Sequence, residues 1–176
     1  MAVNRYMHNP LKYFKLHPDV KAPMFATEGS ACFDIHAFIP DGTEVVAYDT
    51  WGDYRKLVVN EKESIFLTKG TRALIPTGLI FDIDKGWSVR LHSRSGLALK
   101  AGLVLANAEG VIDSDYVEPV FVMMINVGDR HQTLSNGDRI CQGEKIMSYH
   151  YGLEEVNEKP LKKADRDGGF GATGTK

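Results

Sequence analysis

The sequence has only two cysteines, Cys32 and Cys141, and they lie far apart. Neither stands near histidines at zinc-finger spacing, so a disulfide scaffold and a zinc finger are both excluded. No apolar run approaches the roughly 20 residues of a membrane-spanning helix. The polar start, Met1–Pro10, does not resemble a signal peptide. These absences predict a reduced, soluble protein with no membrane partner, located in the cytoplasm (or in the host-cell cytoplasm if the source is viral).

The sequence also lacks an excess of charge of either sign. Its 21 Lys and Arg residues nearly balance its 23 Asp and Glu residues, which gives a net charge of -2. Such a chain does not attract polyanions as a whole, so we expect no nucleic-acid partner. A small phosphate-bearing substrate is compatible with this charge, because a few placed cations and backbone amides suffice to bind it. A length of 176 residues, 43% of them hydrophobic, suits one domain with a real core.

Short β-rich runs separated by turn residues dominate the chain and predict an all-β fold: a sandwich, a jelly roll or a barrel. One segment, Ser95–Ala101, is rich in helix formers and stops at Gly102, which predicts a single short helix. The predicted strands are 13–16, 35–39, 56–59, 64–67, 73–75, 79–83, 87–91, 120–126 and 140–149.

Two segments stand out from this β pattern. The stretch 41–63, with polar residues around Trp51 and Tyr54, is typical of an inserted hairpin or loop. The stretch 164–176 has glycines around a single aromatic residue and cannot bury enough surface to fold alone. We therefore expect a β domain over 1–163, followed by a tail or flap over 164–176.

The segment Gly110–Tyr116 carries the first candidate chemistry. Asp113 and Asp115 stand two apart, so on a strand both carboxylates would project from the same face. Clustered carboxylates suit a general base or a cation site. Taken alone, the pattern is more often a hairpin turn with exposed acids. Strands predicted at 103–105, before Asn107, and at 111–112, before the acidic pair, together resemble a β-hairpin.

Three further motifs offer anion donors. Arg94, Ser95 and Gly96 mark a strand-to-helix junction, where outward amides favour an anion; capping by Ser93 or Ser95 is an equally good interpretation. In Asn136–Gln142, Arg139 and Gln142 follow a tight Asn-Gly turn, and a solvated hairpin is the simpler explanation. The glycines of 168–174 expose amides that suit phosphates, and Phe170 suits stacking on a base, although a glycine-rich terminus is by default a flexible tail.

Each fragment is weak, but in this order they resemble the five motifs of the trimeric dUTP pyrophosphatase (dUTPase) family. The core Gly-Val-Ile-Asp-Ser-Asp-Tyr of the third motif is highly specific. The resemblance spans roughly residues 11 to 174. The five matching stretches are 31–37 with Asp34, 93–98, 107–116, 137–142 and 168–174.

This resemblance implies a distorted jelly-roll subunit and a homotrimer in which the C-terminal arm of one chain closes over an active site at the junction of others. It implies hydrolysis of dUTP to dUMP and pyrophosphate, with Asp113 activating the water. It also implies Mg²⁺ as cofactor, with Asp34 in its outer shell through water. The substrate-binding residues that it implies are Arg94, Ser95, Gly96, Asn107, Gly110, Ile112, Tyr116, Arg139, Gln142, Arg166, Gly169, Phe170 and Gly171.

The sequence departs from the family pattern at five places. The stretch between the first and second motifs, centred near Trp51, is longer than usual. Cys32 replaces a glycine in the first motif, and Ser93 replaces a proline in the second. After Tyr116 the usual Xaa-Gly is replaced by the run 117–119, Val-Glu-Pro. Arg166 stands one residue closer to the glycines of the fifth motif than the family's arginine.

Two other functions fit parts of the sequence. dCTP deaminase shares the fold and an Ile-Asp motif, but needs a glutamate where the run 122–126, Val-Met-Met-Ile-Asn, has methionine; Glu118 nearby keeps this alternative open. A non-catalytic regulator that acts through 41–63 is the second alternative. The set of Asp113, Tyr116, Arg94 and the arm favours the enzyme over a binding protein.

Overall fold

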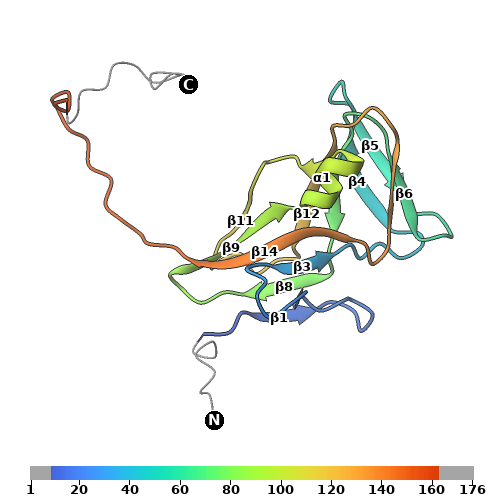
Figure 1. Cartoon of the computed structure of the whole chain (residues 1–176), viewed down its shortest axis with the longest axis horizontal. Coiled ribbons are helices and arrows are strands. Elements are labelled where there is room, and N and C mark those ends of the chain that lie inside the picture. Colours follow the sequence, from blue (N-terminus) through green and yellow to red (C-terminus); the bar gives the residue numbers. More distant parts are fainter. Residues whose placement is uncertain (1–8, 163–176) are drawn as a thin grey trace, which may run out of the picture.

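The computed structural model describes residues 9–162, and two five-stranded sheets form most of it (Figure 1). The first sheet has the strand order β10-β12-β7-β4-β5 and the second β11-β9-β14-β3-β2. Two-stranded sheets, β1-β8 and β13-β6, complete the fold. The strands are β1 (Lys12–Lys15), β2 (Met24–Phe25), β3 (Phe33–His36), β4 (Glu44–Tyr48), β5 (Tyr54–Val58), β6 (Ser64–Leu67), β7 (Arg72–Pro76), β8 (Leu79–Asp82), β9 (Trp87–Ser93), β10 (Leu103–Leu105), β11 (Gly110–Ile112), β12 (Phe121–Asn126), β13 (Gln132–Ser135) and β14 (Arg139–Met147), and the helix is α1 (Ser95–Ala101).

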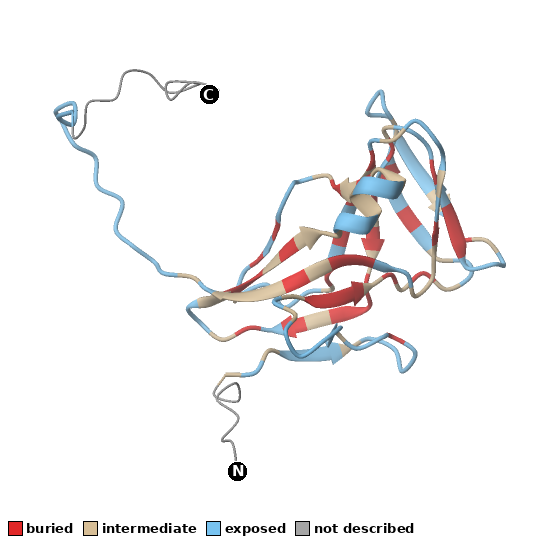
Figure 2. Ribbon diagram, in the orientation of Figure 1, coloured by how far each residue is buried: buried red, intermediate tan, exposed pale blue. Residues whose placement is uncertain are grey.

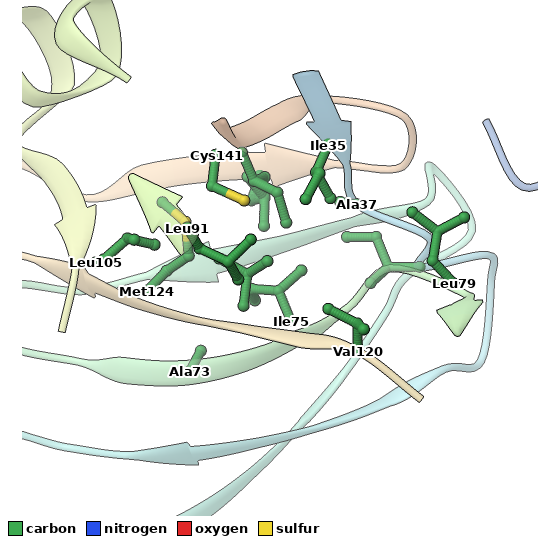
Figure 3. Packing of buried hydrophobic residues seen from close by; sticks show 14 of the residues in the cluster. Ile35, Ala37, Ala73, Ile75, Leu79, Leu91, Leu105, Val120, Met124 and Cys141 are labelled. Atoms are coloured by element: carbon green, nitrogen blue, oxygen red, sulfur yellow. The ribbon is translucent and has the colours of Figure 1, made fainter. Parts of the chain in front are cut away.

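The two large sheets share one hydrophobic core. Ile35 and Cys141 from the second sheet are fully buried, as are Ile75 and Met124 from the first, and Figure 3 shows these side chains within one cluster. Figure 2 shows that buried positions alternate with exposed ones along many strands, as expected for sheets with one face covered. Each fully buried large apolar side chain contributes about 1.5–3 kcal/mol to this packing.

The predicted all-β architecture with one short helix is confirmed. The helix occupies the predicted residues, and Gly102 ends it in the left-handed conformation with φ of 66°. Most predicted strands agree with the structure to within a few residues. Three strands were missed: β2 is only two residues long, β13 is largely polar, and β4 lies in the segment taken as an insert.

The segment 41–63 folds as a hairpin of β4 and β5 that extends the first sheet, because β4 also pairs with β7. Asp49 organises the turn: it accepts hydrogen bonds from the N–H groups of Trp51 and Asp53, and its carboxylate lies 2.6 Å from Arg55. Partial burial raises the pKa of Asp49, but these donors outweigh that effect and the pKa is lowered. That this hairpin is an insertion relative to the family remains a prediction.

After β14 the chain leaves the body of the fold and runs outward (Figure 1). Residues 151–162 are exposed throughout, and several are large and apolar: Tyr151 is 80% exposed, Leu153 91% and Leu161 89%. Within residues 9–162, no helix is long and apolar enough to cross a membrane.

Candidate active site

Asp34 is a buried carboxylate that holds two arginines. One oxygen lies 3.3 Å from Nε of Arg94, within ion-pair distance but outside hydrogen-bond geometry, and the other accepts a hydrogen bond from Arg139 at 3.0 Å. Arg94 also donates to the backbone carbonyl of Arg139 at 3.0 Å. Only 8% of the Asp34 side chain is exposed, against 22% and 50% of the two arginine side chains. Two cations fixed by one anion leave a net positive site at the surface, suited to a phosphate.

A β-bulge in β14 places Arg139 in this cluster. Arg139 pairs with His36 and Cys141 with Ile35, so Ile140 is an extra residue between them. Ile140 and Cys141 are consecutive and both buried, which a regular pleat does not allow. The bulge therefore brings Arg139 to the same side of the sheet as Asp34.

A hollow of about 260 Å³ lies beside the two arginines. Its lining includes Leu97 and Ala101 of α1 and Leu134 of β13, together with Arg94 and Arg139. The hollow is thus lined by α1 and β13, with the two arginines at its edge.

The junction before α1 is built differently from expectation. The N-cap residue is Arg94, and within the described chain its side chain makes no capping hydrogen bond, so capping by Ser93 or Ser95 is wrong. The Ser93 hydroxyl instead accepts the N–H of Leu105 at 2.9 Å. Ser93 therefore ties the end of β9 to β10. Ser95 and Gly96 are exposed at the start of the helix, where their amides face outward.

The predicted hairpin around residue 107 is also wrong. Leu103–Leu105 pairs with β12 and Gly110–Ile112 pairs with β9, so the two strands are the outer strands of different sheets. In the described structure each therefore has one edge without a partner strand. The loop that carries Asn107 connects these two edges. The N–H groups of Ala106, Ala108 and Glu109 are already bonded within the chain, so the unpaired strand edge of β11 is where backbone groups are open to a ligand.

The turn at Asn136 also differs from the predicted hairpin. The Asn-Gly turn is present, with Gly137 at φ of 77°, but β13 pairs with β6 while β14 pairs with β3 and β9. It links two sheets and does not close a hairpin. Gln142 lies on β14, in register with Asp34 on one side and His92 on the other, which puts it next to the arginine pair.

Asp113 follows β11 and is exposed, and within residues 9–162 no side chain pairs with its carboxylate. A turn follows, in which the N–H of Tyr116 donates to the carbonyl of Asp113 at 3.2 Å. The Tyr116 hydroxyl donates to the carbonyl of Pro119 at 2.9 Å. The unusual Val-Glu-Pro run thus anchors the tyrosine, which is 41% exposed.

Gly110 and Ile112 fix the strand before Asp113. A Cβ on Gly110 would approach the Leu91 side chain at 3.0 Å, so the tight pairing with β9 favours glycine here. Ile112 is 6% exposed and anchors the strand in the core. Asn107 is exposed in the connecting loop.

Within one chain, Asp113 and the arginine pair are far apart. Ile112 pairs with Val89, so Asp113 lies near the level of Ser88, at the opposite end of β9 from Arg94. Six residues of a strand span about 20 Å. The described chain therefore forms two half-sites: a loop with an acid between two sheet edges, and an anion-binding cluster. The predicted Arg166, Gly169, Phe170 and Gly171 lie outside the described residues.

Two features near the arginine pair were not predicted from the sequence: the lowered pKa of His36 and the pairing of Asp34 with two arginines. Burial and the charge of Lys21 lower the pKa of His36, with Arg139 and Arg94 adding to this against the opposing pull of Asp34. The role of Asp34 in pairing two arginines was missed as well, because residues 34, 94 and 139 show no common spacing and only the strand pairing brings them together.

The fold and these half-sites define an all-β protein of the jelly-roll class with an anion-binding surface. Comparison with known proteins agrees: the dUTPase family model matches residues 56–174. A deoxyuridine 5'-triphosphate nucleotidohydrolase of Caulobacter vibrioides is 36% identical and covers 93% of this chain and 92% of its own length. The enzyme of that name from Brucella melitensis is 41% identical over 76% of this chain and 87% of its own.

Solved structures show the same fold. A mutant dUTPase of Staphylococcus bacteriophage 80alpha with dUpNHpp superposes with a TM-score of 0.72 and 19% identity, covering 94% of this chain and 99% of that one. The dUTPase from Streptococcus mutans superposes with a TM-score of 0.59 and 23% identity, covering 80% of this chain and 98% of that one. The chain belongs to the dUTPase family.

Proposed function

We propose that this protein is a dUTP diphosphatase, which hydrolyses dUTP to dUMP and pyrophosphate. The observation that carries the proposal is the match, at 33–41% identity over most of the chain, to enzymes named for this reaction. The reaction keeps uracil out of DNA and supplies dUMP for thymidylate synthesis, and a cytoplasmic location belongs to the same proposal. Both half-sites have the chemistry that the reaction requires.

Asp113 is the proposed base. It accepts a proton from a water molecule as the water oxygen attacks the α-phosphorus, and the bond from that phosphorus to the oxygen bridging to the β-phosphate breaks. Pyrophosphate leaves with the electron pair of that bond. Exposure of Asp113, with no partner within the described residues, keeps its carboxylate available to a water.

Arg94 and Arg139 are the proposed phosphate ligands. Negative charge on the triphosphate must be compensated before a nucleophile can approach, and fixed guanidinium groups do this without reorganising. Asp34 supports this role because it holds both groups in place. Ser95, Gly96 and Gln142 add hydroxyl, amide and carboxamide donors beside them.

The two sheet edges are the proposed uracil site. Backbone groups of Gly110 and Ile112, with the side chain of Asn107, would pair with the edge of the base. Cytosine would leave polar groups of this site buried without hydrogen-bond partners, which costs about 1–3 kcal/mol of binding free energy for each group. Tyr116 would pack on the deoxyribose and leave no room for a 2′-hydroxyl, which its bond to Pro119 supports by fixing the ring.

A homotrimer is the proposed assembly, because it joins the half-sites of different chains. The separation of Asp113 from Arg94 along β9 supports a shared site. The exposed apolar residues of 151–162 also support it, since such a segment favours a covering partner. It leads to the arm, 164–176, in which Phe170 would stack on uracil while Arg166, Gly169 and Gly171 contact phosphates.

Mg²⁺ is the proposed cofactor, and it would neutralise charge on the triphosphate when bound. Both oxygens of Asp34 already face arginines, so direct coordination by Asp34 does not fit. Contact through a water does fit, with phosphate oxygens as the inner ligands that Mg²⁺ prefers. The chain's own contribution is then to hold the phosphates in place.

Nucleotide profiling tests the proposal. The purified chain with Mg²⁺ should release pyrophosphate from dUTP and spare dCTP, dTTP and UTP. Ammonia and pyrophosphate are measured in parallel. Ammonia from dCTP would instead identify a deaminase, and no turnover of any nucleotide would favour a binding protein.

A further inference from the structure

Three metal-ligating side chains meet on the outer face of the second sheet. The Sγ of Cys32, a ring nitrogen of His92 and a carboxylate oxygen of Glu144 lie within 4.8 Å of one another, and all three residues are half-buried. Nε2 of His92 is 3.5 Å from the nearest oxygen of Glu144. The proposed reaction assigns no role to any of the three.

Strand pairing produces this cluster from distant parts of the sequence. Gly143 of β14 pairs with Phe33 of β3 on one side and with Leu91 of β9 on the other. Phe33 and Leu91 point into the core. The adjacent residues, Cys32 just before Phe33, His92 just after Leu91 and Glu144 just after Gly143, therefore share the opposite face.

Both ring nitrogens of His92 lie within 4 Å of a carboxylate oxygen. Its Nδ1 lies 3.7 Å from a carboxylate oxygen of Glu109, whose other oxygen is 3.7 Å from Arg90. Metal-ligating histidines usually direct their second ring nitrogen to such a carboxylate, which fixes the tautomer. The Nε2 atom is buried, has no hydrogen-bond partner within the described chain and lies on the side of the Glu144 carboxylate, so it is available to an ion.

We propose that Cys32, His92 and Glu144 bind one Zn²⁺ ion. Sulfur, imidazole nitrogen and carboxylate oxygen are the ligands zinc prefers, whereas Mg²⁺ prefers oxygen alone. Tetrahedral bonds of about 2.0–2.3 Å hold ligand atoms about 3.3–3.7 Å apart, so a small side-chain rotation completes the set. Water takes the fourth position. The ion links the residue before β3 to β9 and β14, next to Asp34.

The charges of the cluster fit a cation. A divalent cation stabilises the thiolate, and the thiol proton passes to solvent on binding. Thiolate and carboxylate then balance the two charges of the ion.

Cobalt binding to the full chain, without a histidine tag and after removal of metals, tests the proposal. Co²⁺ is the probe because a thiolate ligand gives it a charge-transfer absorption band that oxygen ligands do not. We expect one Co²⁺ per chain, this band, displacement by Zn²⁺ and none by excess Mg²⁺. Cys32→Ser should abolish the band, and His92→Gln or Glu144→Gln should each weaken binding at least tenfold.

Cys141→Ala is the matched control. Cys141 is fully buried in the core, so this variant should bind Co²⁺ as the unmodified chain does. Circular dichroism confirms folding of each variant, and Glu144→Gln replaces Cys32→Ser if the latter fails to fold. The proposal is overturned if the unmodified chain shows no thiolate band or less than one ion per chain, or if Cys32→Ser and Glu144→Gln bind as tightly as the unmodified chain.

Discussion

Asp113 and Asp34 are the same residue type in opposite surroundings, and the surroundings separate their roles. Asp113 is exposed and has no charged partner within residues 9–162, whereas Asp34 is buried between two arginines. A carboxylate that is free to contact water suits a base. One that is compensated by two guanidinium groups suits positioning.

Asp113→Asn should fold normally and lose turnover of dUTP by about 100-fold or more, because the amide cannot accept the proton of water. Steady-state kinetics of the purified variant measure this loss. Glu118→Gln is the control: Glu118 is exposed nearby, and its loss should leave turnover close to normal. If Glu118→Gln is the inactive variant, the base has been assigned to the wrong residue.

Asp34→Ala should lower the free energy of unfolding by about 3 kcal/mol, because it leaves Arg94 partly buried beside a second cation. The value lies at the low end for a broken buried pair, since Arg139 remains half-exposed. Urea unfolding at fixed protein concentration measures the change. Asp129→Ala breaks an exposed pair with Lys69 and should change little. Equal losses in both variants would contradict the anchoring role.

At the scale of elements, the sequence predicts the bounds of a helix or strand well where they depend on neighbouring residues alone. The helix Ser95–Ala101 and strand β6 (Ser64–Leu67) were predicted at their observed bounds, because helix formers, glycine stops and apolar runs act over a few residues. Pairing is not local. The loop around Asn107 joins two sheets where a hairpin was expected, and only the register reveals the Asp34 cluster.

Gly102→Ala tests how α1 is held. Gly102 is left-handed, and a Cβ there would lie 2.7 Å from the backbone nitrogen of Gly128. In Gly102→Ala, backbone strain of about 1 kcal/mol and the clash with rigid backbone should both lower the stability of the fold. Gly86→Ala is the control, since φ is also positive but nothing lies within 4 Å. Thermal unfolding should therefore show a clearly larger loss for Gly102→Ala, and equal losses would show that no clash exists.

At the scale of the whole molecule, the proposal makes the arm part of the catalytic unit. The family match reaches residue 174, and the exposed segment 151–162 leads toward it. Deleting 168–176 should leave the assembly intact and reduce turnover far more than nucleotide binding. Native mass spectrometry, kinetics and nucleotide titration separate these effects. Full activity in the truncated chain would make the segment an ordinary tail.

The central claim is that one active site combines Asp113 of one chain with Arg94 of another. Co-expression of Asp113→Asn and Arg94→Ala chains tests it most directly, because each variant alone lacks one half-site. Mixed assemblies contain sites with both intact halves, so dUTP turnover should rise well above the sum of the separate variants. If mixed assemblies form but turnover does not recover, both halves act within one chain, and the shared site is contradicted.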